Sequence, residues 1–220
     1  MDLTAPGIGM QQKEYNPVIR IAARIISYLF HPVFIPVYLG MFIIFELRLF
    51  LEATAWERTK LLIMFIMYYA FFPLVVTLLL KALNFIESIQ LKTQKDRIIP
   101  YVICQVFYFW GWYVFRNLPG APMEAELLGL GIFLGAALGL ILNAYMKISM
   151  HGIAVGVMSA FMIVAGITTG VSFGIYIAIA LFIAGLTMTA RLIDSNHTPH
   201  EIYFGFFSGA LMLLVAWVFV

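Results

Sequence analysis

The chain has 220 residues, of which 63% are hydrophobic and only 11% charged, and its mean hydropathy is +0.99. Because a soluble domain carries about 25% charged residues, this composition excludes a water-soluble globular protein and predicts an integral membrane protein. The formal net charge of +2 is too small to indicate a nucleic-acid partner.

The first part of the chain predicts a polar tail followed by a broken helix. Residues 1–17 are expected to form the tail, and residues 18–220 a single transmembrane domain. The first apolar run, about 25–45, contains His31, Pro32 and Pro36. Proline removes a backbone donor, so we expect this run to be kinked or to divide into an interfacial piece and a shorter span. His31 is interpreted as part of this break, not as a ligand.

The rest of the chain predicts regular membrane spans. Residues 46–60 are charged enough for a loop or interfacial turn, and the apolar runs beyond them are hydrophobic on all sides of a helix. The fold class is therefore an all-α polytopic transmembrane helix bundle of about seven spans, or six if the first run is interfacial. The further spans are expected at about 61–83, 98–115, 127–145, 150–167, 172–189 and 199–220.

Glycines in the second half recur every four residues. Such small residues allow two helix backbones to approach closely in lipid, where no hydrophobic force drives helices together. The pattern predicts a compact bundle in the second half of the chain. The glycines concerned are Gly131, Gly135, Gly139, Gly152, Gly156, Gly205 and Gly209.

Three polar clusters follow the second, fourth and sixth of the seven spans, so they are predicted to share one side of the membrane with the N-terminus. The first cluster holds Lys92, Lys95 and Arg97, the second Lys147, Ser149 and His151, and the third Arg191, His197 and Glu201. We expect the three to meet in one phosphate site, because ionisable groups near membrane spans are costly to retain.

Structural explanations compete for several of these residues. Arg191 also suits the negative end of the sixth helix, and Ser149 suits the cap of the fifth. Thr198-Pro199-His200-Glu201 has the pattern of a capping box. The basic residues around Lys92 also suit a membrane interface.

Capping requires neither His151 nor His197, and both lie beside a helix start whose free N–H groups attract anions. A neutral imidazole attacks phosphorus when a carboxylate holds its other nitrogen. Glu201 follows His197 by four residues, about one helical turn. The second imidazole, His151, is then the candidate general acid for the leaving oxygen.

These residues resemble the signatures of the phosphatidic acid phosphatase type 2 superfamily. Arg191-x5-His197-x3-Glu201 is similar to its third signature, Ser-Arg-x5-His-x3-Asp, with Ala190 in place of Ser and Glu in place of Asp. Residues 148–151 resemble the second, Pro-Ser-Gly-His, with Ile and Met in place of Pro and Gly. Lys92-x4-Arg97-x2-Pro100 resembles the first, Lys-x6-Arg-Pro, with different spacing.

The resemblance implies a metal-independent lipid phosphatase with no cofactor. It implies His197 as the nucleophile, Glu201 as its orienting carboxylate, and His151 as the general acid. Phosphate would be bound by Arg191, Ser149, Arg97 and Lys92, with Lys95 and Lys147 as further candidates. The implied substrates are phosphatidic acid, phosphatidylglycerol phosphate, a polyprenyl pyrophosphate or a lipid A phosphate, and the partners are membrane lipids.

The sequence also predicts a location for the protein and leaves two other functions as alternatives. We expect a multi-pass protein of the bacterial inner membrane with its site on the extracytoplasmic face. The cation bias does not decide the side, because many cations are themselves candidate phosphate ligands. A transporter or binder of anionic lipids and a metal-dependent intramembrane hydrolase remain alternatives, the latter using His151, His197, His200, Glu201 and Asp194. Transfer of phosphate to another lipid instead of water, and the oligomeric state, stay open.

Overall fold

The computed structural model describes residues 15–47, 53–86, 94–170, 172–194 and 197–220. In these ranges the secondary structure is entirely helical. Six helical stretches are long and apolar enough to cross a membrane, which confirms the predicted fold class and indicates a multi-pass, membrane-embedded protein. They are Ala55–Ala82, Ile98–Arg116, Met123–Asn143, Met150–Thr169, Gly174–Asp194 and Pro199–Phe219.

The first apolar run is divided into two helical pieces, which is one of the two forms expected from its prolines. Helix α1 (Pro17–Leu29) ends before His31 and Pro32, and α2 (Ile35–Met41) continues directly into the π-helix η1 (Phe42–Glu46). The apolar helix Ile35–Glu46 belongs to the shorter class and spans only about 18 Å at 1.5 Å per residue, against about 30 Å of hydrocarbon. The number of full-length spans is therefore six among the described residues.

The first full span begins earlier than predicted. Residues 46–60 were expected to be a loop or turn, but α3 (Ala55–Ile66) starts within them. Thr54 and Glu57 form a capping box, in which the Glu57 carboxylate accepts from the Thr54 N–H at 2.8 Å. A second π-helix, η2 (Met67–Phe71), joins α3 to α4 (Phe72–Ala82), so the three segments form one continuous span.

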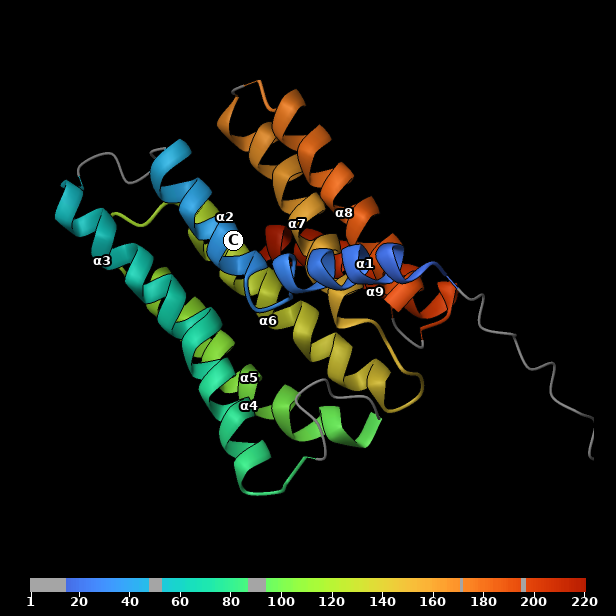
Figure 1. The fold of residues 1–220 in the computed structure, drawn as a ribbon. Helices are drawn as coiled ribbons and strands as arrows, with labels where there is room; N and C mark the ends of the chain where they lie inside the picture. The colour runs from blue at the N-terminus through green and yellow to red at the C-terminus, as the bar shows by residue number, and fades with distance from the viewer. Residues whose placement is uncertain (1–14, 48–52, 87–93, 171, 195–196) are drawn as a thin grey trace, which may run out of the picture.

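The remaining five helices form the greater part of the bundle in Figure 1. Two helix starts were predicted too late, because α5 begins at Gln94 instead of about 98, and α6 begins at Met123 instead of about 127. Its first turn contains the buried Glu124, which accepts a 3.2 Å hydrogen bond from the Thr168 hydroxyl. The five are α5 (Gln94–Arg116), α6 (Met123–Asn143), α7 (Met150–Thr169), α8 (Gly174–Asp194) and α9 (Pro199–Phe219).

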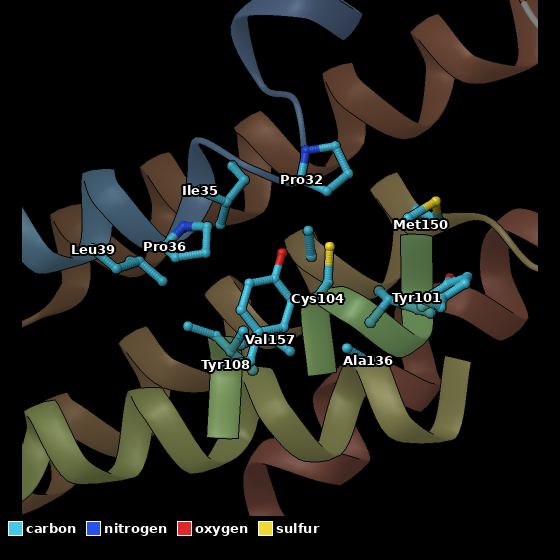
Figure 2. A pocket seen from close by; sticks show the side chains of 13 residues that line it. Pro32, Ile35, Pro36, Leu39, Tyr101, Cys104, Tyr108, Ala136, Met150 and Val157 are labelled. Atoms are coloured by element: carbon cyan, nitrogen blue, oxygen red, sulfur yellow. The ribbon is translucent and has the colours of Figure 1, made fainter. Parts of the chain in front are cut away.

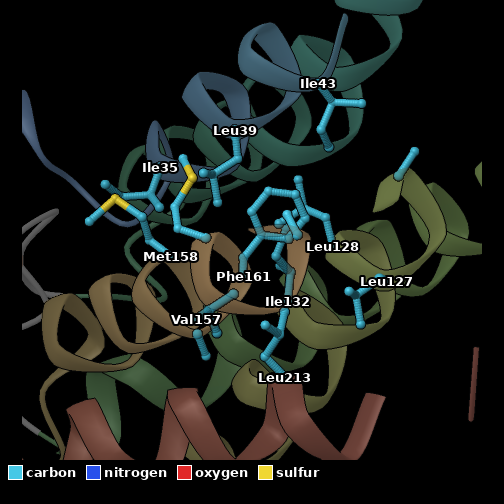
Figure 3. Packing of buried hydrophobic residues seen from close by; sticks show 14 of the residues in the cluster. Ile35, Leu39, Ile43, Leu127, Leu128, Ile132, Val157, Met158, Phe161 and Leu213 are labelled. Carbon is cyan, nitrogen blue, oxygen red and sulfur yellow. The ribbon is translucent and has the colours of Figure 1, made fainter. Parts of the chain in front are cut away.

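The main apolar core lies where α2, α3, α6, α7 and α9 meet (Figure 3). Phe161 of α7 and Leu128 of α6 are fully buried there, and Leu39 of α2 packs against the same cluster. The short α2–η1 segment is therefore part of the bundle core although it does not span a full bilayer. At its far end, Glu46 accepts a 2.6 Å hydrogen bond from the Tyr176 hydroxyl at the start of α8.

Helices α7 and α9 are packed backbone against backbone, as the glycine spacing predicts. A Cβ atom added at Gly152 would lie 2.6 Å from the Ile202 carbonyl oxygen, and one added at Gly205 would lie 2.6 Å from that of Ser149. Gly156 and Gly209 face the carbonyls of Phe206 and Ile153 in the same way. The contact brings the first turns of α7 and α9 together.

Substitution of these glycines should therefore destabilise the protein. We expect Gly156→Ala and Gly209→Ala to lower the free energy of unfolding by about 3 kcal/mol, because the added methyl group meets rigid backbone. Gly185→Ala of α8 is the matched control, since nothing lies within 4 Å of its added Cβ and alanine favours helix. The test is thermal unfolding in detergent, and equal melting temperatures for all three variants would contradict the packing argument.

Candidate functional site

The candidate site is built on the paired starts of α7 and α9. The Ser149 N–H donates a 3.2 Å hydrogen bond to the Glu201 carbonyl, which joins the residue before α7 to the first turn of α9. The α1–α2 connection, the start of α7, the end of α8 and the start of α9 all contribute side chains here. The second and third polar clusters therefore meet, as their position in the chain predicts.

His197 and Glu201 form a hydrogen-bonded pair at the start of α9. The Nδ1 atom of His197 lies 2.8 Å from Oε2 of Glu201, and the exposed fractions of the two side chains are 3% and 17%. A carboxylate accepts hydrogen bonds, so Nδ1 carries the hydrogen and Nε2 is the unprotonated nitrogen of the neutral ring. The contact expected from the spacing is present, while the chemical roles of the two residues stay predictions.

The same carboxylate caps α9. Glu201 Oε2 also accepts from the Thr198 N–H at 3.1 Å, and the Glu201 N–H donates to the Thr198 hydroxyl at 3.4 Å. This is the capping box expected from the sequence. The structural and functional interpretations of Glu201 are thus compatible, because one oxygen serves both the helix start and the imidazole.

His151, in the first turn of α7, is oriented by a backbone group from a distant part of the chain. Its Nε2 atom lies 3.1 Å from the carbonyl oxygen of Ser27 in α1. A carbonyl only accepts, so Nε2 carries the hydrogen and Nδ1 is the atom left to exchange a proton. Arg191 and His197 both lie within electrostatic range of the ring. The charges of Arg191 and His197 therefore both act on the imidazole of His151.

His31 also belongs to this cluster, which the sequence interpretation missed. Its ring packs edge-to-face against His151 with the centroids 5.2 Å apart, and Arg191 acts on its charge. Burial, reinforced by Arg191, lowers the pKa of His31 from 6.5 to about 4. The sequence did contain a signal for this role, because His31 is an ionisable residue inside an apolar run. Such residues are costly to keep near a membrane span and are functional candidates.

The remaining predicted site residues occupy varied positions. Ser149 is fully buried, and its hydroxyl caps α7 by accepting from the Gly152 N–H at 3.2 Å. Lys147 is half-buried beside it. Lys92 lies outside the described residues, and Lys95 and Arg97 lie in the first turn of α5, where only the backbone is described.

The residues named for a metal site are dispersed. His200 is exposed on the first turn of α9, and Asp194 is paired with Arg24 of α1 at 3.2 Å. Among the described residues, no group of three histidine, cysteine, aspartate or glutamate side chains is arranged to hold a metal ion. The Arg24–Asp194 pair instead fastens α1 to the end of α8, beside the imidazoles.

An apolar cavity of about 70 Å³ lies between the helices near the candidate site (Figure 2). Pro32 and Met150, the chain neighbours of His31 and His151, line one part of it. The cavity continues between α2, α5, α6 and α7, where Cys104 and Tyr108 face it. A polar site and an apolar cavity are thus adjacent, which suits a ligand with a charged head and a hydrocarbon body.

Comparison of the chain with protein-family models, with curated proteins and with solved structures finds no significant match.

The lowered pKa of His31 predicts a specific pH dependence of stability. Below pH 6.5 the unfolded chain binds a proton at this residue that the folded protein does not bind until about pH 4. Stability should therefore fall as the pH decreases through this window, by about 3 kcal/mol from His31 alone. Thermal unfolding between pH 8 and 4.5 should show a smaller loss for His31→Gln than for the wild type. Identical pH profiles would contradict the argument.

Proposed function

We propose that the protein is a metal-independent lipid phosphatase that acts through a phosphohistidine at His197. The observation that carries the proposal is the 2.8 Å contact between His197 and Glu201, with His151 and Arg191 close by, at the ends of membrane-spanning helices. A buried imidazole held by a carboxylate, beside a second imidazole and a cation, is suited to phosphoryl transfer.

In the first step, Nε2 of His197 attacks phosphorus while Glu201 stabilises the imidazolium that forms. The bond between phosphorus and the leaving oxygen breaks, and His151, which enters this step as the imidazolium, gives its Nδ1 proton to this oxygen and becomes neutral. Arg191 neutralises the phosphoryl oxygens. In the second step, water gives a proton to His151 and attacks phosphorus, the P–N bond breaks, and inorganic phosphate is released.

The apolar cavity supports a lipid as the substrate. A phosphate held by Arg191 and the imidazoles would leave its hydrocarbon part beside Pro32 and Met150, where the cavity starts. The substrate class is thus a phosphomonoester or pyrophosphate of a membrane lipid. We place the enzyme in the bacterial inner membrane with this site on the extracytoplasmic face.

A non-catalytic binder of anionic lipids is the second candidate. The observation in its favour concerns Ser149, one of the predicted phosphate ligands. Its hydroxyl is buried and already accepts a hydrogen bond from the first turn of α7, so its observed role is in the fold. A binder would use the same cations and cavity but release no phosphate.

The nucleophile assignment is tested by comparing two histidines in the same segment. Phosphate release from a panel of lipid phosphates should fall by at least about a thousandfold in His197→Ala, because the covalent route is lost. His200→Ala should retain most of the activity, since this exposed side chain lies outside the cluster. Chelator should have no effect on release. Absence of release by the wild type would favour the binder, and equal losses in both variants would contradict the assignment.

The general-acid assignment is tested with two leaving groups. His151→Ala should slow hydrolysis of an alkyl lipid phosphate by about 10²- to 10⁴-fold, because an alkoxide leaves only with a proton. An activated aryl phosphate should be affected far less, since its phenolate leaves unprotonated. The rates of both substrates are measured for wild type and variant. Equal slowing of the two would show that His151 acts in another way.

A further inference from the structure

The candidate site contains a third imidazole, from a part of the chain that none of the three polar clusters includes. His31 lies in the connection between α1 and α2, more than 100 residues from His151 in sequence. The two rings nevertheless touch edge-to-face at 5.2 Å. The proposed reaction assigns no role to His31, so the presence of an ionisable side chain at this position needs a separate explanation.

The hydrogen bonding of His31 defines its tautomer. Its Nδ1 atom accepts from the Val33 N–H at 3.4 Å, so in the neutral ring the hydrogen is on Nε2. Among the described residues, nothing accepts a hydrogen bond from this Nε2. This nitrogen is not among the buried polar atoms that lack a partner, so its hydrogen is accessible to a molecule that enters the site. The ring therefore offers the site an uncharged hydrogen-bond donor.

The backbone around His31 keeps the ring in place. The His31 carbonyl accepts from the N–H groups of Phe34 at 2.8 Å and Ile35 at 3.3 Å, which closes a turn at the start of α2. Pro32 has no N–H to donate, and its ring restricts the backbone of this turn. The turn and the contact with His151 together limit the orientations that the imidazole can adopt.

The charges around His31 favour an anion as the acceptor. His151 of α7 contacts the ring and the charge of Arg191 of α8 acts on it, and neither provides a negative charge. A neutral His31 is tolerated beside Arg191 and still donates one hydrogen. An anion bound by Arg191 would supply the acceptor that the described residues lack.

We propose that His31 is an anion-binding residue of this site and donates its Nε2–H to a non-bridging oxygen of the substrate phosphate. The inference rests on the proposed function in that both assign a phosphate to the cluster. It adds that the α1–α2 connection, and not only the paired starts of α7 and α9, determines affinity for the head group. Because the pKa of His31 is about 4, the residue remains an uncharged donor at neutral pH.

The test measures binding of inorganic phosphate and orthovanadate, which requires neither a known lipid nor turnover. Titration calorimetry is performed at pH 7 on the full-length protein in detergent. His31→Gln retains an N–H donor near the position of Nε2, whereas His31→Phe retains the ring volume without a donor. His200→Phe is the matched control, since it makes the same change at an exposed histidine.

We expect wild type, His31→Gln and His200→Phe to bind both anions with dissociation constants within about threefold of one another. His31→Phe should bind at least about tenfold more weakly, as expected for a lost hydrogen bond to a charged group. If the Phe variant does not fold, as judged by thermal unfolding, His31→Ala serves as the donor-free variant.

The outcomes separate the two proposals. Binding of neither anion by the wild type would contradict the phosphate site itself, and this inference with it. Equal binding by wild type and the donor-free variant would overturn the role of His31 and leave the proposed function intact. Loss of binding in both the Gln and the donor-free variants, with the protein folded, would overturn the donor role as well.

Discussion

The close contact between α7 and α9 is the interaction on which the rest of the structure depends. Gly152 and Gly156 of one helix and Gly205 and Gly209 of the other bring backbone against backbone. In lipid this contact has no hydrophobic driving force, so it depends on van der Waals packing, which only residues without side chains permit here. One turn beyond the glycines, the Ser149 N–H bonds to the Glu201 carbonyl. The two helix starts that carry the site are thereby fixed relative to each other.

Most polar groups of the candidate site have a role in the fold as well as in the proposed chemistry. Glu201 caps α9 through the Thr198 N–H and holds the His197 ring with the same oxygen. The Ser27 carbonyl orients His151, and the Arg24–Asp194 pair holds its helix against α8. An exposed ion pair adds little to stability, so we interpret this one as a contact that positions α1. The N-terminal helix is thus a component of the site, and not an appendage to the bundle.

The sequence predicted the spans well because their signal is local. A run of about 20 apolar residues has few alternatives to a membrane helix, since every backbone group must be satisfied within the segment. Errors occurred where polar side chains belong to a helix. The capping box at Thr54 and Glu57 starts α3 inside a charged stretch, and the buried Glu124 lies in the first turn of α6 because Thr168 of α7 hydrogen-bonds to it. The partner of Glu124 is 44 residues away in the sequence, so the residues around Glu124 do not indicate it.

Local patterns in the sequence were enough to predict an all-helical membrane protein with a break near Pro32, glycine-lined helices, and a contact between His197 and Glu201 from their four-residue spacing. Each of these depends on residues within a turn or two of one another, so spacing is enough to find them. Three long-range contacts became visible only in the folded chain: His31 touches His151, the Ser27 carbonyl orients that ring, and Asp194 pairs with Arg24. These contacts depend on how α1 crosses the bundle (Figure 1). The direction of a helix after a break is fixed by the surfaces it packs against, which no local spacing encodes.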